Sequence, residues 1–589
     1  MGCTTKRSSG FAGWLLLWLP IAVALAGCPA APDGETDAGS GEVAEMAATG
    51  PPAVDGWPMW GQNPHNTRSQ PAETVISAAN ASGLVKKWVT GVHGSILATP
   101  AVVDGFVYVP DSAGYLYKID AETGDVVWEH KVEDYVNRKG DVARATPAVD
   151  GGSLIFGTQS PRIVENLLEK QQAYVVSVDA ETGATVHWRQ GVEETRAPRI
   201  TQSAVVDDGT VYVGVAAGEE QLALVPLYKC CKHRGSVVSL DAATGEILHK
   251  QYMIPQIEGL SGGSVWGSTA VVDTARSALY VTTGNNYSVP ESVEKCLLGC
   301  IDSNCSPEET EACLATLPDN HFDSIVALDL ENLQVKWAHQ GLLYDAWADP
   351  CVVAPIDSKN CPDPAGPDFD FGQGPSLITL SSGRQLLGAA QKSGIYWALN
   401  PDTGAVVWET RVGPGGLQGG SEWGSATDGE RVYVAISNSD KSDWTLQGNG
   451  TLAGFVVSRG FWSALDAATG TILWQTPEPK DTLIPLRGPK GPVTVANGVL
   501  FGGTTTSGDH TMFALDAASG AILWTYDPGG TVNSGAAVVD GVVYWGAIAR
   551  FDDEDDSSSE YATGKFIPEG EGKLFAFCVG GTDGCPVPG

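Results

Sequence analysis

One short phrase returns eight times along the 589 residues, and this repetition constrains the fold more than any other feature of the chain. The phrase is an acidic or amide residue, a small residue, Thr-Gly or Ser-Gly, and then Trp three or four residues on. Its clearest copies are Asp120 to Trp128, Asn400 to Trp408, Asp466 to Trp474 and Asp516 to Trp524. Weaker copies follow Asp179, Asp241 and Asp329, with His249 or Trp337 at the aromatic place, and only the tail remains at Trp88. A period of roughly 40 to 50 residues, with four short strands per unit, is typical of a β-propeller blade.

Eight apolar strand sets accompany the phrases. They are Ala101 to Val109, Ala148 to Phe156, Ala204 to Val213, Ala270 to Val281, Leu377 to Gly388, Ala426 to Val434, Val493 to Phe501 and Ala537 to Trp545. The last set, which continues to Lys573–Cys578, has no phrase after it, whereas the Trp88 segment has no strand set before it. We therefore expect residues 57–589 to form an all-β, eight-bladed β-propeller that the Trp88 segment closes as an N-terminal outer strand. The repeated tryptophans are expected to pack between adjacent blades.

The N-terminus has the pattern of an export signal. Lys6 and Arg7 precede an apolar run from Phe11 to Ala26, too short for a comfortable membrane span. This run ends in Leu25-Ala26-Gly27-Cys28, which resembles a bacterial lipobox. The resemblance implies a signal peptide over residues 1–27, lipidation of Cys28, and an anchor on the periplasmic or outer-membrane side of a bacterial envelope. Residues 28–56, rich in Ala, Pro, Gly and acids, are expected to form a disordered tether.

The cysteines indicate disulfides in an oxidising compartment. Of 12 cysteines, Cys3 lies in the signal and Cys28 would carry lipid, which leaves an even number in an exported chain. Cys351 with Cys361, and Cys578 with Cys585, are predicted pairs. Four more crowd an insertion over residues 287–322, and their pairing cannot be read from the sequence: Cys296, Cys300, Cys305 and Cys313. A zinc site is disfavoured because these spacings lack a Cys-x-x-Cys pair.

Charge excludes one class of partner. The formal net charge of -35 argues against nucleic acid, whose phosphates require a basic face. No Cys-x-x-Cys-His occurs, so we expect no covalent haem. The acidic run Asp552 to Asp556 lacks the glycine spacing of a calcium loop and is interpreted as a solvated loop.

Some residues break the repeat at equivalent places and are candidates for a site on the propeller axis. Arg144, Thr201, Trp266 and Trp423 all stand shortly before the inner strand of their own blade. A second group follows the second strand of a blade: Glu219 and Glu220, Asn285 and Asn286, and Lys392. Taken singly, each of these residues is more commonly structural, and only their shared register points to a site. A carboxylate and an amide at one height suit a hard cation such as calcium, while a Trp suits a planar aromatic ligand whose acidic groups Arg and Lys would hold.

Several longer segments resemble the quinoprotein alcohol dehydrogenases, propeller enzymes that bind pyrroloquinoline quinone (PQQ) and calcium on their axis, and especially the branch that acts on polyvinyl alcohol. These segments are Cys230–Gly245, Thr282–Ser288, Asp345–Cys351, Gly366–Leu377, Gln391–Gly404 and Gly419–Ala435. The resemblance runs from about Trp57 to the C-terminus. It implies PQQ-dependent oxidation of an alcohol, including polymeric secondary alcohols, with electrons passed to a separate carrier such as a cytochrome c.

The resemblance also implies roles for single residues. Glu220, with Glu219 as the near alternative, Asn285 and Asp345 resemble the calcium ligands. Asp345 also resembles the catalytic base, and Lys392 the cation beside the reactive carbonyls. The remaining predicted cofactor contacts are Arg144, Thr201, Trp266, Trp423, Cys230 and Cys231. The chain departs from the family at Leu97, where an acid is usual, at Glu422, where an Asn is usual, and in the late position of Cys230-Cys231.

A different class of function also matches the repeats. Lipid-anchored eight-bladed propellers that assist outer-membrane protein assembly carry the same Trp phrase and have no catalytic site. A polymer-binding module is a related alternative. The scaffold hypothesis predicts no cation ligands on the axis, whereas this chain has Glu220, Asn285 and, by the family resemblance, Asp345.

Overall fold

The computed structural model describes residues 56–160, 167–225, 228–303, 305–352, 359–480, 487–508, 510–549, 571–582 and 584–586. All of them lie in one compact unit, Ala48–Gly589. The predicted signal peptide, Cys28, and the acidic run at 552–556 lie outside the described residues. Within these described ranges, no helix is long and apolar enough to cross a membrane.

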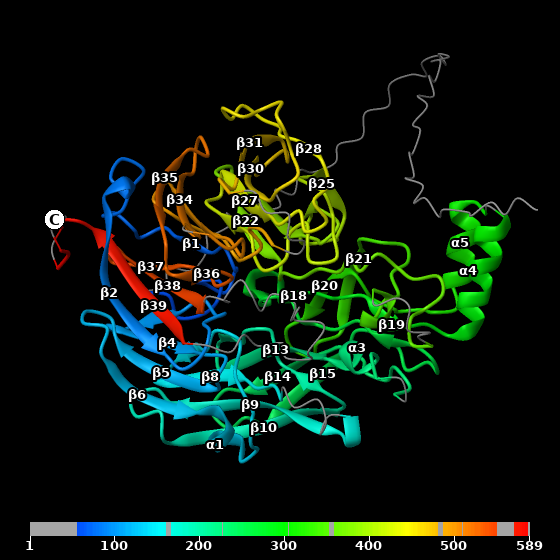
Figure 1. Ribbon diagram of the computed structural model, residues 1–589. Helices are drawn as coiled ribbons and strands as arrows, with labels where there is room; N and C mark the ends of the chain where they lie inside the picture. Colours follow the sequence, from blue (N-terminus) through cyan, green and yellow to red (C-terminus); the bar gives the residue numbers. More distant parts are fainter. Residues whose placement is uncertain are drawn as a thin grey trace, which may run out of the picture. The chain divides into compact units, whose positions relative to one another are not determined.

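Eight antiparallel sheets of four main strands form the blades, which confirms the predicted all-β, eight-bladed propeller (Figure 1). The first four blades, from the inner strand outward, are β3 (Ala101–Val103), β4 (Phe106–Pro110), β5 (Tyr115–Asp120) and β6 (Val126–Lys131); β7 (Ala148–Asp150), β8 (Ser153–Gly157), β9 (Gln171–Asp179) and β10 (Val186–Thr195); β12 (Val205–Asp207), β13 (Thr210–Ala217), β14 (Ser236–Asp241) and β15 (Ile247–Tyr252); β17 (Val271–Asp273), β18 (Ala278–Thr282), β20 (Ser324–Asp329) and β21 (Val335–Gln340).

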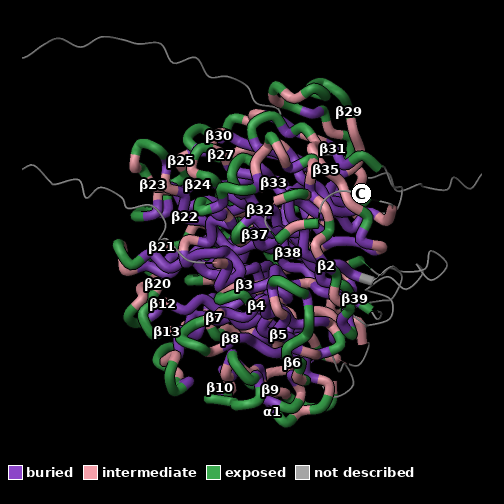
Figure 2. The backbone as a smooth tube through the Cα atoms, turned by 90° about the vertical axis from the view of Figure 1, so that its left-hand side faces the viewer, coloured by how far each residue is buried: buried purple, intermediate pink, exposed green. Residues whose placement is uncertain are grey.

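The other four blades are β22 (Ser376–Thr379), β23 (Gln385–Ala390), β24 (Ile395–Leu399) and β25 (Val406–Arg411); β26 (Ala426–Thr427), β27 (Arg431–Ile436), β30 (Phe461–Asp466) and β31 (Ile472–Pro477); β32 (Thr494–Ala496), β33 (Val499–Gly503), β34 (Met512–Asp516) and β35 (Ile522–Tyr526); β37 (Ala537–Val539), β38 (Val542–Ala549), β39 (Gly572–Val579) and β2 (Leu84–Val92). Inner strands of neighbouring blades contact one another from β37 through β3 to β32, and the Thr494 hydroxyl of β32 donates to the carbonyl of Ala536, next to β37, so the ring is closed. The strands are mostly buried and the connecting turns exposed (Figure 2).

The N-terminal strand closes the ring as predicted. β2 pairs antiparallel with β39 and places Trp88 opposite Ala576, so a strand that precedes the first blade in the sequence becomes the outer strand of the last blade. Both sheet edges that a linear order would leave open are thereby covered.

The repeated phrase joins neighbouring blades. The Trp474 indole N–H donates to the Ala517 carbonyl of the next blade at 3.1 Å, and Gly520 of that blade lies under the ring. Equivalent bonds run from Trp88 to Ala121, Trp128 to Glu181, Trp188 to Ala242, Trp337 to Pro401, Trp408 to Ala467 and Trp524 to Leu84. The Trp of one phrase and the Gly of the next are therefore two halves of one contact, whereas His249, at the Trp place in its blade, is exposed.

This contact predicts a large difference between two glycine substitutions. A Cβ at Gly520 would lie 2.5 Å from the Trp474 ring, whereas a Cβ at Gly498 meets nothing within 4 Å; both glycines have a similar positive φ, +73° and +78°. Gly498→Ala should lower the free energy of unfolding by about 1 kcal/mol from backbone strain alone. Gly520→Ala should suffer the same strain and lose about 1 to 3 kcal/mol more of the free energy of unfolding, because its new methyl group overpacks against the Trp474 ring. Urea denaturation of both variants measures the difference, and equal losses would show that the ring contact contributes nothing.

The segment from Trp57 to Gln70 runs along the inner strands of the ring. Its backbone exchanges hydrogen bonds with Val102 through Trp57, and its carbonyls accept from inner-strand N–H groups of five more blades: Val149 to Pro58, Val272 to Pro64, Leu377 to His65, Thr427 to Thr67 and Val495 to Arg68. β1 (Ser69–Gln70) then pairs parallel with β32, and Gln70 Nε2 donates to Val538 O at 3.1 Å. This N-terminal segment thus ties together inner strands of seven blades, which the repeat analysis did not anticipate.

Two helices form the predicted disulfide-rich insertion. α4 (Glu291–Ser303) and α5 (Pro307–Leu314) are joined by Cys296–Cys313 and Cys300–Cys305, a pairing that the sequence left open. The predicted pairs Cys351–Cys361 and Cys578–Cys585 are both present. The insertion packs through Val293 and Leu297 onto a cluster that contains Ala346, so it lies next to Asp345.

One buried carboxyl outside the axis predicts a pH effect on stability. Glu478 is 1% exposed, Thr504 donates to its Oε2 at 2.7 Å, and burial raises its pKa from 4.5 to about 7. Because the folded-state pKa lies above the unfolded one, the stability contribution of the protonated form is lost as pH rises through 7. Glu478→Gln should therefore stabilise the protein by about 3 kcal/mol at about pH 8.5 and by little at about pH 4.5. Urea denaturation at both pH values tests this, and a pH-independent difference would contradict it.

Candidate active site

Two of the predicted axial residues, Lys392 and Trp266, meet through a carboxylate that the sequence reasoning did not single out. Lys392 follows β23, and its Nζ lies 2.7 Å from Asp370 Oδ1 and 3.1 Å from Asp368 Oδ2. The Trp266 indole N–H donates to the other Asp370 oxygen at 2.6 Å, and Lys392 Nζ lies 5.3 Å from the Trp266 ring centroid. Burial disfavours the charged amine, but Asp368 and Asp370 raise the pKa of Lys392 well above its usual value. Lys392 is therefore a fixed positive charge beside the indole.

Asp345 is a fully buried carboxylate held by backbone. Its Oδ1 accepts from the Asp368 N–H at 3.1 Å and its Oδ2 from the Phe369 N–H at 2.6 Å. Burial raises the pKa of Asp345 to about 6, although these two donors lower it. The group is thus a base of moderate strength in a fixed orientation.

Asn285 lies next to this carboxylate in the fold. The backbone N–H of Asn286 donates to the Asp345 carbonyl at 3.0 Å, and the side-chain amide of Asn285 donates to the carbonyls of Trp347 at 2.9 Å and Asn286 at 3.1 Å. Both amide hydrogens are used in this way. The side-chain oxygen is left as the atom that can coordinate a cation.

The structure favours Glu220 over its neighbour as a candidate metal ligand. In α3 (Glu219–Leu222), the Glu219 carboxylate accepts from the N–H groups of Lys232 at 2.7 Å and His233 at 2.6 Å, and from the Tyr228 hydroxyl. Glu219 therefore holds the loop that follows. Burial raises the pKa of Glu220, as does Asp370, whereas Lys392 lowers it, so Glu220 faces the same group of charges as Lys392.

A further acid, Asp349, belongs to this group. It begins the short helix η3 (Asp349–Cys351), which packs against α3. Asp349 is 1% exposed and neither of its carboxylate oxygens has a hydrogen-bond partner. Burial and the charge of Glu220 raise its pKa well above the usual value. Asp349, like Asp368 and Asp370, stands inside a segment that carried the family resemblance, but only the folded loops show that it joins the cluster.

The donor set fits a cation. Buried or half-buried acids lie close together around Lys392: Glu220, Asp323, Asp345, Asp349, Asp368 and Asp370. Lys392 lowers the pKa of Glu220, Asp349 and Asp368, and Arg199 lowers that of Glu220 and Asp349. The unpartnered Asp349 oxygens and the available Asn285 oxygen are ligands that calcium prefers. Among the described residues, no group of three or more His, Cys, Asp or Glu side chains stands in a ready-made metal geometry. Glu220 and Asp345 would coordinate the cation together with Asn285 and Asp349.

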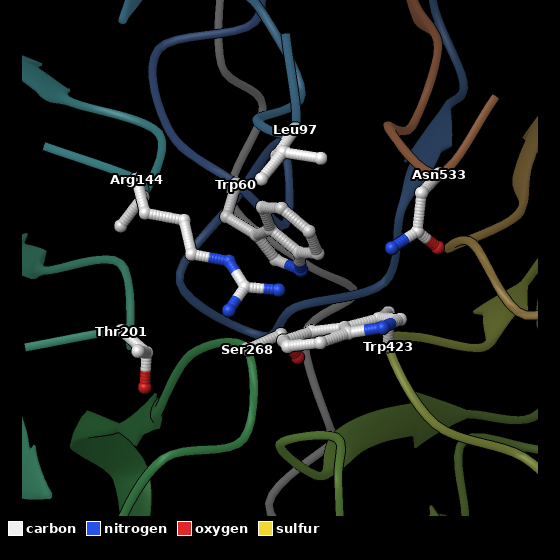
Figure 3. A pocket seen from close by; sticks show the side chains of 8 residues that line it. Trp60, Leu97, Arg144, Thr201, Ser268, Trp423 and Asn533 are labelled. Carbon is white, nitrogen blue, oxygen red and sulfur yellow. The ribbon is translucent and has the colours of Figure 1, made fainter. Parts of the chain in front are cut away.

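The aromatic residues and Arg144 meet on the other side of this cluster. The Trp266 and Trp423 ring centroids are 5.4 Å apart at 78°, the Thr201 hydroxyl donates to the Trp266 carbonyl at 3.1 Å, and Arg144 Cζ lies 4.5 Å from the Trp423 ring centroid. The adjoining pocket holds about 330 Å³ of empty space, part of which is open to solvent (Figure 3). Its lining residues are Trp60, Leu97, Arg144, Ala145, Thr201, Ser268, Trp423 and Asn533.

Cys230 and Cys231 form a disulfide on the acidic side of the site. Cys231 Sγ lies 3.9 Å from the Glu219 carbonyl, and the Cys230 N–H donates to Asn360 Oδ1 at 3.3 Å. The pair does not line the pocket described above. The departures noted in the sequence also face the site: Leu97 lines the pocket, and Glu422 raises the pKa of Lys392.

Comparison with known proteins finds one matching family model and several similar alcohol dehydrogenases. A family model described as "Outer membrane protein assembly factor BamB" matches residues 55–251 and 459–563, just over half of the chain. A polyvinylalcohol dehydrogenase from Sphingopyxis sp. (strain 113P3) is 29% identical over 517 residues, which covers 83% of this chain and 70% of that protein. A polyvinylalcohol dehydrogenase from Pseudomonas sp. is 28% identical over 492 residues, covering 80% and 67%.

A solved structure supports the fold. The crystal structure of quinohemoprotein alcohol dehydrogenase from Comamonas testosteroni has a TM-score of 0.60 and 20% sequence identity to this chain, and the match covers 91% of this chain and 82% of that one.

Proposed function

We propose, from the premise that this chain belongs to the quinoprotein alcohol dehydrogenase family, that it oxidises an alcohol with PQQ and calcium and passes the electrons to a separate carrier such as a cytochrome c. The substrate class that we propose is a secondary alcohol, including polymeric ones, because two relatives are named for polyvinyl alcohol. We also propose that the chain is exported and lipid-anchored through Cys28.

The observation that carries this proposal is the convergence of Asp345 and Lys392 with Trp266 on one side and Glu220, Asn285 and Asp349 on the other. A flat aromatic surface, a fixed cation, a buried base and a set of oxygen ligands are thus collected from five separate segments of the chain. Non-catalytic blade contacts do not require any of them.

Each group has a distinct task in this reaction. When bound, PQQ supplies the hydride acceptor and calcium supplies Lewis-acid polarisation. Asp345 takes the hydroxyl proton of the alcohol as general base, and the N–H groups of Asp368 and Phe369 keep its oxygens aimed. Glu220, Asn285 and Asp349, with Asp345, would hold the metal. Trp266, Trp423, Thr201 and Arg144 would orient the cofactor, and Lys392 would place positive charge beside it.

Reconstitution tests the proposal. Purified protein is incubated with PQQ and calcium, and reduction of an artificial dye is followed with primary, secondary and polymeric alcohols. We expect alcohol-dependent reduction that requires PQQ and is lost when a chelator removes the metal. Dye reduction that does not change when PQQ is added, with any of the alcohols, would favour the alternative, a lipid-anchored scaffold or polymer-binding propeller. The description of the matching family model, an outer membrane protein assembly factor, agrees with that alternative.

Two adjacent glutamates should separate metal binding from folding. Glu220→Gln removes a proposed ligand charge, so calcium should raise the melting temperature of this variant much less than that of the wild type. Glu219→Gln weakens three hydrogen bonds of the following loop, so it should lower the melting temperature and leave the calcium-dependent rise in place. Thermal melts with and without calcium measure both effects. The opposite pattern would assign the ligand to Glu219.

A further inference from the structure

The N-terminal segment supplies one wall of the axial pocket through Trp60. This residue lines the pocket together with Arg144, Trp423 and Asn533 (Figure 3). The Trp60 indole N–H is buried and has no hydrogen-bond partner among the described residues. Leaving a buried donor unpaired costs about 1–3 kcal/mol, so an acceptor that enters the pocket would gain by meeting it.

A second guanidinium lies behind this indole. Arg68 Cζ is 4.9 Å from the Trp60 ring centroid, and Arg68 is fully buried. Its hydrogen bonds run only to neutral oxygens: the carbonyls of Val493 and Trp60 and the hydroxyls of Thr99 and Thr494. Burial lowers its pKa to about 9, which still leaves it charged at neutral pH. A buried charge without an opposite partner is costly, and an anion nearby reduces that cost.

The charges around the axis are therefore segregated. Arg144 lines the pocket, Arg68 packs against Trp60 in its wall, and no Asp or Glu is among the described residues that line it. The acidic cluster around Lys392 contacts Trp266, which in turn contacts Trp423 of the pocket. One end of the axial site suits a cation and the other an anion.

We propose that Trp60 is a cofactor-binding residue of this chain: its indole N–H donates to a carboxylate of bound PQQ, with Arg144 beside that carboxylate and Arg68 behind the ring. This inference rests on the proposed function and adds to it a binding residue from outside the repeats. The segment that ties the blades together would thus also contribute directly to the ligand site.

Replacing Trp60 by phenylalanine tests the proposal, because the ring remains and only the N–H is lost. Calorimetric titration measures the affinity of the apo-protein for PQQ and for phenanthrenequinone, a planar quinone without carboxylates. We expect Trp60→Phe to weaken PQQ binding about tenfold and to leave phenanthrenequinone binding unchanged. Trp128→Phe, which removes an indole N–H bonded to the Glu181 carbonyl in a blade contact, is the matched control and should not change PQQ affinity.

The outcomes separate the two proposals. If the wild type binds PQQ and Trp60→Phe binds it equally well, the inference is overturned and the proposed function stands. An equal loss for both quinones would assign Trp60 a packing role and also overturn it. If the wild type binds no PQQ at all, the proposed function itself fails.

A second measurement needs no variant. Benzene-1,3,5-tricarboxylate should displace PQQ from the wild-type protein competitively, whereas neutral benzene-1,3,5-tricarboxamide should not. Absence of competition by the tricarboxylate would overturn the anion subsite.

Discussion

Asp345→Asn should reduce the rate of alcohol oxidation by about 100-fold or more, because an amide cannot take the hydroxyl proton and general base catalysis contributes about 10² to 10⁴. The asparagine keeps one acceptor for the N–H groups of Asp368 and Phe369, so the loop that carries it should remain folded. PQQ affinity should change far less than turnover. Steady-state dye reduction and calorimetric PQQ titration on the same sample measure the two quantities.

A conservative change elsewhere provides the control. Asp466 belongs to a blade phrase, where its Oδ1 accepts from the N–H groups of Ala468 and Thr469, and an Asn oxygen can do the same. Asp466→Asn should therefore retain wild-type turnover. Wild-type turnover in Asp345→Asn itself would remove the base from the proposed reaction.

Arg68→Met should lower the free energy of unfolding by about 4 kcal/mol, because it removes several buried hydrogen bonds at once. Arg68 joins the N-terminal segment to two blades, through Thr99 on one side and Val493 and Thr494 on the other. Its removal leaves two buried carbonyls, those of Val493 and Trp60, without this donor. Urea denaturation measures the loss.

The matched control for this stability prediction is Arg411→Met. Arg411 is exposed and donates to a single carbonyl, that of Ser393 at 3.0 Å. This variant should lose no more than about 1 kcal/mol. Equal losses in the two variants would show that the N-terminal segment does not hold the blades together.

The blades were predictable because each contact between them is encoded locally. The Trp474 indole and Gly520 belong to successive copies of the same phrase, so the repetition that marks the blades in the sequence also describes their packing. Ring closure was predictable because the Trp88 segment has no strand set before it, and the last strand set has no phrase after it, so each supplies what the other lacks. The predicted axial residues Arg144, Thr201, Trp266 and Trp423 lie together because equal register in each blade means equal height on the axis.

The rest depended on contacts without periodicity. The N-terminal segment bonds to the inner strands mainly through its backbone, which leaves no side-chain pattern to read. Asp349 joins the acid cluster because η3 packs against α3, and the choice between Glu219 and Glu220 is made by hydrogen bonds that Lys232 and His233, more than ten residues later, donate to Glu219. The insertion cysteines lie too close together in the chain for spacing to decide their partners.

Anaerobic single-turnover spectroscopy tests the central claim most directly. Protein loaded with PQQ and calcium is mixed with a secondary alcohol in the absence of any electron acceptor, and the absorption of the bound cofactor is followed. We predict that the oxidised-quinone absorption is lost at a rate that depends on the alcohol, and that Asp345→Asn slows this loss. Bound PQQ whose spectrum no alcohol changes would contradict it.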